Sequence, residues 1–140
     1  MFPSAAGGTP AVVIDTNRVL DLWLFDDPQV DALRDAIARG GARWLAQPAM
    51  REELARVLGY PAVLAQLARR QRTADVVLAA FDRWSHPVPA ADPAPVRCRD
   101  PDDQIFIDLA VAWRARLFSK DLAVLALARR LAPLGVTVER

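Results

Sequence analysis

Residues 11–17 read Ala11-Val12-Val13-Ile14-Asp15-Thr16-Asn17, and this stretch does most to decide the fold. Its first four residues form an apolar, largely β-branched run that is typical of a strand buried on both faces, as in a parallel sheet. The next three are residue types that cap helices, so we expect a helix to begin soon after the strand. In an open α/β sheet the functional crevice lies beyond the carboxyl ends of the strands, and Asp15 falls at such an end.

The rest of the chain alternates short strands with longer helices, which predicts a parallel sheet with helices on both faces. Further strands are predicted at 43–46, 116–119 and 136–138. The segment 85–96 contains Pro87, Pro89, Pro93 and Pro95, so we expect an extended loop with room for a short edge strand at most. Helices are expected from Val19 to Leu24, from Pro28 to the pair Gly40-Gly41, from Pro48 to Gly59, and over 63–72, 76–84, 102–114 and 122–131.

The composition favours one globular domain in a reducing compartment. The chain has 140 residues, is 53% hydrophobic and carries a formal net charge of +1. A charge so close to neutral means that any nucleic-acid site must be a local basic patch. Cys98 is the single cysteine, which excludes an internal disulfide, and no apolar run reaches the ~18 residues of a membrane span. We expect residues 1–10 to be a flexible N-terminus, residues 11–140 to form a single domain, and the protein to be cytoplasmic, with no membrane partner.

Acidic residues recur in four distant segments, each at or beside a predicted turn from strand to helix. They are Asp15, the pair Glu52-Glu53, the run Asp100-Pro101-Asp102-Asp103, and Asp121 after Ser119-Lys120. Gathering carboxylates from distant segments costs folding free energy because like charges repel. Such a cluster usually persists because a hard cation such as Mg²⁺ lies between the carboxylates. The pattern therefore indicates a metal site.

Each acid also has a structural explanation of its own. Asp15 and Asp121 suit helix N-caps, and Glu53 suits a solvated helix face. Acids in the first turn of a helix are favoured by the helix dipole, which accounts for one or two members of the run 100–103. Three acids within four residues exceed what a cap requires, and the run lacks the regular ligand series of an EF-hand. Asp108, further along, is interpreted either as a surface residue or as a peripheral site residue.

Taken in order, these segments resemble the PIN-domain nucleases. The resemblance rests on the strand ending Val12-Val13-Ile14-Asp15-Thr16-Asn17, the helix with Glu52-Glu53-Leu54, the segment Cys98 to Asp103 leading into an apolar helix, and Leu117-Phe118-Ser119-Lys120-Asp121. It covers nearly the whole chain from Ala11, and it looks most like the bacterial branch described as toxins of toxin–antitoxin systems. The resemblance implies an α/β fold, a three-layer α/β/α Rossmann-like sandwich with a central, mostly parallel sheet. It also implies a Mg²⁺ or Mn²⁺ site that cuts RNA.

The same resemblance implies a set of catalytic and metal-binding residues: Asp15, Glu53, Asp103 and Asp121. Glu52 remains the alternative to Glu53, and Asn17, Asp100 and Lys120 are supporting candidates. In this interpretation Asp15 and Asp103 ligate the ion directly, while the other two acids act through waters or hold a second ion. The expected partners are an RNA substrate, an antitoxin protein and a second copy in a homodimer. The helices between residues 63 and 84 offer apolar faces for either protein partner.

One departure from the family pattern keeps other functions open. Ala123 stands where related sequences commonly carry another Asp. The alternative is therefore a catalytically weak PIN-like module that binds RNA or a protein. A phosphatase of the haloacid-dehalogenase kind also places an Asp after its first strand, but that group needs a second Asp where this chain has Asn17.

The remaining polar and aromatic residues receive simpler interpretations. Candidates for phosphate contact, each equally suited to charge balance beside an acid, are Arg18, Arg51, Arg56, Arg99 and Lys120. The basic run 69–72 is interpreted as a solvated helix end. The tryptophans are assigned to the core or to partner contacts. His86 is expected at the surface, and Cys98 is expected to pack rather than to react.

Overall fold

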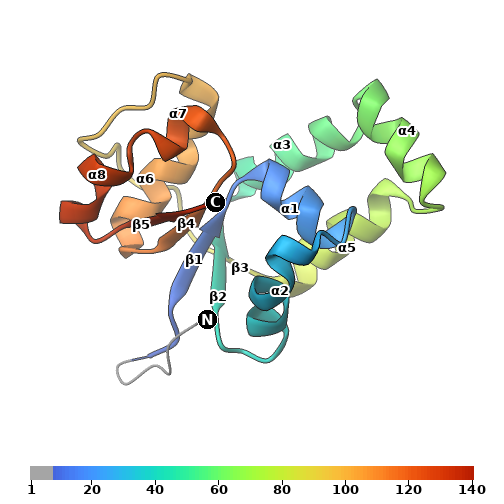
Figure 1. Cartoon of the computed structure of the whole chain (residues 1–140), viewed down its shortest axis with the longest axis horizontal. Coiled ribbons are helices and arrows are strands. Elements are labelled where there is room, and N and C mark those ends of the chain that lie inside the picture. The colour runs from blue at the N-terminus through green and yellow to red at the C-terminus, as the bar shows by residue number, and fades with distance from the viewer. Residues whose placement is uncertain (1–7) are drawn as a thin grey trace.

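One parallel sheet of five strands, in the order β3-β2-β1-β4-β5, forms the centre of the protein (Figure 1). The computed structural model describes residues 8–140. The strands are β1 (Ala11–Ile14), β2 (Arg43–Ala46), β3 (Ser85–Pro87), β4 (Arg116–Phe118) and β5 (Thr137–Glu139). The predicted strands are present, and the proline-rich segment supplies the expected short edge strand, β3.

Helices cover both faces of this sheet, which confirms the predicted three-layer α/β/α sandwich. Figure 1 shows α1, α2 and α5 on one side and α6, α7 and α8 on the other, with α3 and α4 extending away from the sheet. The helices are α1 (Thr16–Trp23), α2 (Asp31–Ala38), α3 (Pro48–Leu58), α4 (Pro61–Arg69), α5 (Ala74–Trp84), α6 (Gln104–Trp113), α7 (Leu122–Leu125) and α8 (Ala128–Leu131). Three short 3₁₀ turns accompany them: η1 (Pro28–Val30), η2 (Pro101–Asp103) and η3 (Ala132–Leu134).

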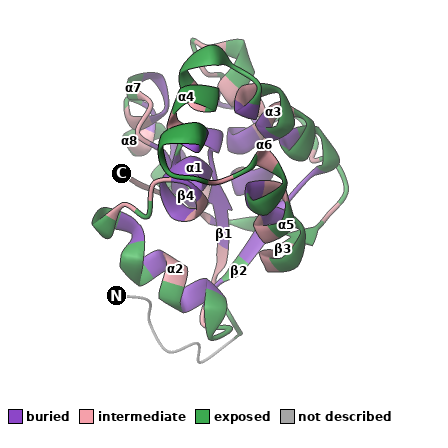
Figure 2. Ribbon diagram, turned by 90° about the vertical axis from the view of Figure 1, so that its right-hand side faces the viewer, coloured by how far each residue is buried: buried purple, intermediate pink, exposed green. Residues whose placement is uncertain are grey.

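The central strands are buried on both faces, as their apolar sequence predicts. Val12 and Val13 in β1 and Leu117 in β4 are all 0% exposed. Figure 2 shows the central strands in the colour of buried residues, between helices whose outer faces are exposed. Burying apolar side chains contributes roughly 1.5–3 kcal/mol for each large one, so these strands anchor the fold. The carboxyl ends of β1 and β4 are held in place by this packing.

The strand order reverses between β1 and β4, and this reversal decides where a site can form. From β1 the chain crosses to β2 and then β3 on one side, and it returns to β4 and β5 on the other. The crossovers leave β1 and β4 in opposite directions, so a crevice opens between their carboxyl ends. The registered pair Ile14 and Phe118 ends the two strands. Asp15 follows the first, and Ser119 follows the second.

The predicted continuous helix over 122–131 is wrong. The structure has two short helices, α7 and α8, and Leu127 between them has ψ near 0°. Its backbone N–H donates to the carbonyl of Val124, which tightens the chain at the break. Val124, Leu127 and Leu131 are buried on either side of the break. No proline or glycine marks the break, so local sequence did not predict it.

The two ends of the described part of the chain lie outside the central strands. Of the residues expected to form a flexible N-terminus, 1–7 lie outside the described part, and 8–10 form no helix or strand. The C-terminal strand β5 pairs with β4 at the far edge of the sheet. Within the described residues, no helix combines the length and the apolar character needed to cross a bilayer.

Candidate metal centre

Asp15 serves both as a helix cap and as a buried carboxylate at the crevice. Its Oδ1 accepts the backbone N–H of Arg18 at 3.1 Å, so it caps α1. Its Oδ2 accepts a hydrogen bond from the Ser119 hydroxyl. The residue is 3% exposed, and burial raises the pKa of its carboxyl despite these two donors. Asp15 therefore caps α1, as expected, and also lines the cleft at the carboxyl end of β1.

Three further carboxylates converge beside Asp15. One ligand atom from each of Asp100, Asp103 and Asp121 lies within 4.8 Å of the others. Asp100 caps the 3₁₀ turn η2 and Asp103 is its last residue, just before α6. Asp121 caps α7 by accepting the N–H of Ala123 at 2.8 Å. Segments far apart in the chain thus supply acids to one place. We call these three residues the acidic cluster.

Asp103 carries the clearest electrostatic signature in the cluster. Its pKa is raised to about 7, first by burial, then by a side-chain hydrogen bond with Asp121, and then by the negative charges of Asp121, Asp100 and Asp15. Its Oδ2 is buried and accepts no hydrogen bond within the described part of the chain. A buried acceptor without a donor is costly, and a cation satisfies such an oxygen. Oxygen-only ligands of this kind suit a hard ion such as Mg²⁺ or Mn²⁺, so the residues present fit the implied metal.

Glu53, rather than Glu52, faces the crevice. The Thr16 hydroxyl donates to Glu53 Oε2 at 2.6 Å, which joins the start of α1 to α3. Glu52 is exposed and does not line the crevice. Adjacent helical residues point roughly 100° apart, so one glutamate can face the site and the other cannot.

These groups border a cleft of about 210 Å³ at the carboxyl edge of the sheet. Its lining is mostly polar and acidic: Asp15, Thr16, Asn17, Glu53, Val57, Tyr60, Asp100, Asp102, Asp103 and Phe106. The exposed Asn17 is thus at the cleft, as its motif implied. Asp121 is absent from the lining, but it reaches the site through the acidic cluster.

Three of the proposed phosphate contacts have other partners. Arg18 is 1% exposed and lies 3.0 Å from Asp21 Oδ2, so it is unavailable to RNA. The Nζ of Lys120 lies 2.6 Å from the same oxygen of Asp21. Arg51 forms a two-pronged pair with Asp82 at 2.7 and 2.9 Å. The expected charge balance within the acidic cluster is wrong for these three cations, because their ion-pair partners, Asp21 and Asp82, lie outside it.

The basic run 69–72 has a structural role that we did not predict. Arg72 donates to the carbonyls of Trp23 and Leu24 at 3.2 and 2.8 Å, and it pairs with Asp26. Arg70 donates to the carbonyl of Phe25 at 3.3 Å. These arginines satisfy the carbonyls that the end of α1 leaves free. The run is therefore not simply a solvated helix end.

Aromatic side chains and Cys98 pack largely as expected. Trp44 is 1% exposed and meets Phe81 edge-on, and Trp23 stacks on Trp84 with ring centroids 6.3 Å apart. Trp113 is 41% exposed, so it belongs to the surface rather than to the core. Burial raises the pKa of the Cys98 thiol, which keeps it protonated near neutral pH and disfavours a nucleophilic role. His86 is exposed.

Gln104 and Asp108 form a latch that sequence reasoning missed. The Gln104 amide accepts the N–H of Cys98 at 2.6 Å and donates to the carbonyl of Val96 at 3.0 Å. It also donates to Asp108 Oδ1 at 2.7 Å, and this oxygen accepts the N–H of Ala94 at 2.9 Å. The latch holds the proline-rich segment against α6, just before Asp100. A glutamine within a strongly apolar helix is the signal that pointed to it.

The fold and the site define an α/β protein with an acidic cluster at the switch point of a parallel sheet. A family model described as the PIN domain matches residues 11–118, and the chain belongs to this family. PIN domains are generally nucleases, and such nucleases typically use divalent metal ions. No match to a curated protein was found.

Proposed function

We propose that the chain is a metal-dependent endoribonuclease that hydrolyses RNA phosphodiester bonds with Mg²⁺ or Mn²⁺. The observation that carries the proposal is the buried Oδ2 of Asp103, which has no donor and lies among neighbouring carboxylates. Four acidic side chains at one crevice repel one another unless a cation lies between them. Membership of the PIN family supports nuclease chemistry at this crevice.

Asp103, Asp100 and Asp121 are the residues that would hold the ion. Their ligand atoms lie within 4.8 Å of one another, and Asp103 has an oxygen to offer without breaking a hydrogen bond. The oxygens of Asp15 already accept hydrogen bonds from Arg18 and Ser119, so Asp15 is held rigidly but keeps lone pairs for the ion or its waters. When bound, the ion supplies Lewis acidity toward a phosphate oxygen and lowers the pKa of a coordinated water.

The protein's own groups position the attacking water and the phosphate. Glu53 is fixed by the Thr16 hydroxyl, with its other oxygen left to orient a water at the cleft. The pKa of about 7 belongs to the metal-free Asp103; a bound cation favours the deprotonated carboxylate, so Asp103 acts as a ligand. Asn17 is exposed at the mouth, where its amide can donate to a phosphate.

We further propose that this nuclease is the toxin of a toxin–antitoxin pair. The sequence resemblance to that branch supports it, and so do exposed apolar side chains on the arm formed by α3, α4 and α5. Tyr60, Leu64 and Val76 are each about half exposed, at 49%, 50% and 55%. Exposed apolar residues grouped on one arm suit contact with an antitoxin or with a second copy. A small neighbouring gene for a DNA-binding protein would support the pairing.

Ala123 favours a second candidate, a PIN-like module that binds RNA or a protein but cleaves weakly. The residue is 8% exposed. Its methyl group takes the place of a further carboxylate that the sequences it resembles commonly carry. One carboxylate fewer lowers the affinity for a second ion.

Labelled RNA incubated with the protein and Mg²⁺, with and without EDTA, separates these candidates. The nuclease gives new internal ends in Mg²⁺ that disappear in EDTA and with Asp103→Asn. The binding module retains RNA without cutting it. Release of inorganic phosphate from small phosphomonoesters would instead indicate a phosphatase.

A further inference from the structure

A second cavity lies beside β2 and β3, where these strands meet helices α3 and α5. It has a volume of about 240 Å³, which is below the ~300–1,000 Å³ of drug-sized sites and suits a single small ring system. Its lining is Ala46, Gln47, Pro48, Arg51, Phe81, Asp82, Ser85 and Pro87. We call it the β2–β3 pocket; none of the proposed metal-site residues lines it.

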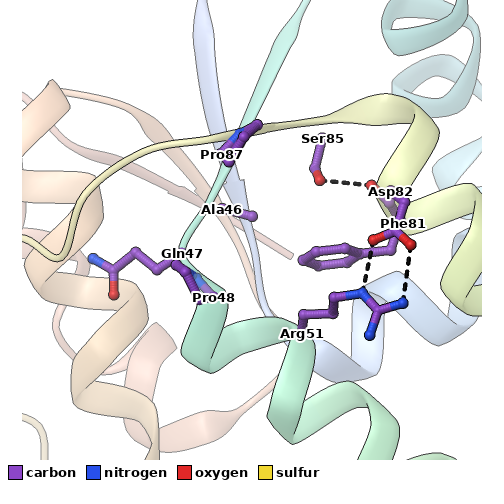
Figure 3. Close-up of a pocket in the computed structure, with 8 residues that line it drawn as sticks. All are labelled: Ala46, Gln47, Pro48, Arg51, Phe81, Asp82, Ser85 and Pro87. Atoms are coloured by element: carbon purple, nitrogen blue, oxygen red, sulfur yellow. Dashed lines mark hydrogen bonds and ion pairs between the residues drawn. The ribbon is translucent and has the colours of Figure 1, made fainter.

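The pocket joins flat apolar walls to a polar rim. In Figure 3 the Phe81 ring extends toward Ala46 and Pro48, and Arg51 and Asp82 lie together at one side. Arg51 uses Nε and Nη2 to bind both oxygens of Asp82, at 2.7 and 2.9 Å. Its Nη1 has no hydrogen-bond partner within the described part of the chain. The Arg51 Nη1 group is therefore a free donor beside the Asp82 carboxylate, whose oxygens are acceptors.

We propose that the β2–β3 pocket takes one unpaired nucleobase of the RNA, beside the scissile bond. A nucleobase is a flat ring whose edge carries adjacent donors and acceptors, and the pocket offers flat walls with a donor and an acceptor at the rim. This inference rests on the proposed nuclease function and names how that nuclease selects its substrate. It implies that the RNA is single-stranded where it is cut.

The register of the sheet places this pocket next to the acidic cleft. Val12 pairs with Trp44, so Asp15 and Gln47 occupy equivalent positions just past the ends of adjacent strands. Neighbouring strands lie about 4.8 Å apart. Helix α3 lies between the two places, with Arg51 at the pocket and Glu53 at the cleft on nearly opposite sides of the helix. A strand of RNA would reach both sites by passing the N-terminal end of α3, where Pro48 lines the pocket.

The edge strand argues against a peptide as the occupant. The N–H of Val88 donates inward to the carbonyl of Ala46 at 3.0 Å. Alternate residues point their nitrogen outward, and at Pro87 and Pro89 that nitrogen has no hydrogen. A peptide strand added to this edge would find no donors there. A nucleobase, which needs side-chain groups only, is not affected.

The first test is direct binding of short single-stranded RNAs that carry 2-aminopurine at successive positions. Binding is measured in EDTA and in Ca²⁺, so that the result does not depend on cleavage of the RNA. We expect the fluorescence of one position to change on binding, and Arg51→Gln and Asp82→Asn to weaken that response roughly tenfold, the size of one base contact. Both side chains are exposed, so these variants fold. Arg130→Gln, an exposed arginine on α8, is the control and should leave the response unchanged.

The second test is sequencing of the ends cut from a random RNA pool in Mg²⁺. The base preference at one position beside the cut should relax in the two pocket variants and persist in Arg130→Gln. The inference would be overturned if RNA binds but the fluorescence change at every 2-aminopurine position is the same in Arg51→Gln and Asp82→Asn as in the unaltered protein. Binding of a peptide, and not of a nucleobase, in the pocket would also overturn it. If neither the unaltered protein nor any variant cuts RNA, the proposed nuclease function is contradicted. The fluorescence test then still decides whether the pocket binds a nucleobase.

Discussion

The Ser119 hydroxyl donates a hydrogen bond to the Asp15 carboxylate, although the two residues are 104 positions apart in the chain. Ser119 is 0% exposed and follows β4, while Asp15 follows β1. The same hydroxyl oxygen accepts the backbone N–H of Asp121 at 3.0 Å. One buried side chain therefore fixes two candidate metal-site acids across the switch point of the sheet.

Replacing Ser119 with Ala should lower the kcat/KM of RNA cleavage by at least roughly tenfold, because a hydrogen bond to a charged group is worth about 1.5–3 kcal/mol. The Asp15 carboxylate would lose a donor while it stays buried. Ser119→Thr keeps the hydroxyl and is the matched control, with smaller loss expected. Equal losses in the two variants would show that packing, and not the hydrogen bond, is what matters at this position.

The two glutamates of α3 should behave differently. Glu53→Gln removes the charge that faces the cleft and should reduce cleavage by roughly tenfold or more. Glu52→Gln alters an exposed neighbour and should leave cleavage within about twofold of the unaltered protein. Single-turnover cleavage of one RNA by each variant measures the difference. A larger effect from Glu52→Gln would reverse the assignment.

The metal-free protein should lose stability as the pH rises from about 5 to about 8. The folded-state pKa of Asp103 is about 7, well above its ordinary value of 3.8, so the folded state holds a proton that the unfolded state has released. Stability therefore falls with pH between these values and levels off above the folded-state pKa. The raised pKa of Asp15 acts in the same direction.

Thermal unfolding in EDTA across this pH range measures the effect. Asp103→Asn should flatten the dependence and raise the melting temperature at pH 8, although it should abolish cleavage. Added Mg²⁺ should stabilise the unaltered protein more at pH 8 than at pH 5. A flat profile for the unaltered protein would contradict the electrostatic account of the acidic cluster.

Breaking the latch should loosen the segment that delivers Asp100. Gln104→Leu keeps a similar volume but leaves the N–H of Cys98 and the carbonyl of Val96 without their partner. Each buried group left unsatisfied costs about 1–3 kcal/mol, so we expect a loss of about 2–4 kcal/mol in the free energy of unfolding. Urea unfolding measures this loss. Hydrogen exchange should speed up at 94–100 and not in β1; uniform acceleration would argue against a local latch.

Much of the fold was predictable because its signals are local. The run Val12-Val13-Ile14 is apolar and β-branched and is followed by capping residues, so strand, helix and the position of Asp15 follow from it. The parallel sheet followed from the alternation of elements. The break between α7 and α8 did not, because neither proline nor glycine marks it and the apolar spacing of Val124, Leu127 and Leu131 is that of a continuous helix.

The candidate site was predictable in its members and less so in its arrangement. The order of acids predicted that Asp103 and Asp121 would lie close together, as they do. Which donor each carboxylate accepts from depends on side chains of distant elements. Lys120 precedes Asp121 in sequence, yet its amine reaches Asp21, a buried acid on α1. Sequence spacing cannot reveal which oxygens already have donors. This is why the contacts of Asp15 with Ser119, and of Glu53 with Thr16, required the structure.

Soaking crystals with Mn²⁺ and locating the ion by its anomalous signal tests the central claim most directly. We expect one ion bound by Asp103 Oδ2 together with a carboxylate oxygen of Asp100 or Asp121, and no ion there in Asp103→Asn crystals. An ion bound elsewhere, or an empty acidic cluster at saturating Mn²⁺, would contradict the proposal that these carboxylates form a metal centre.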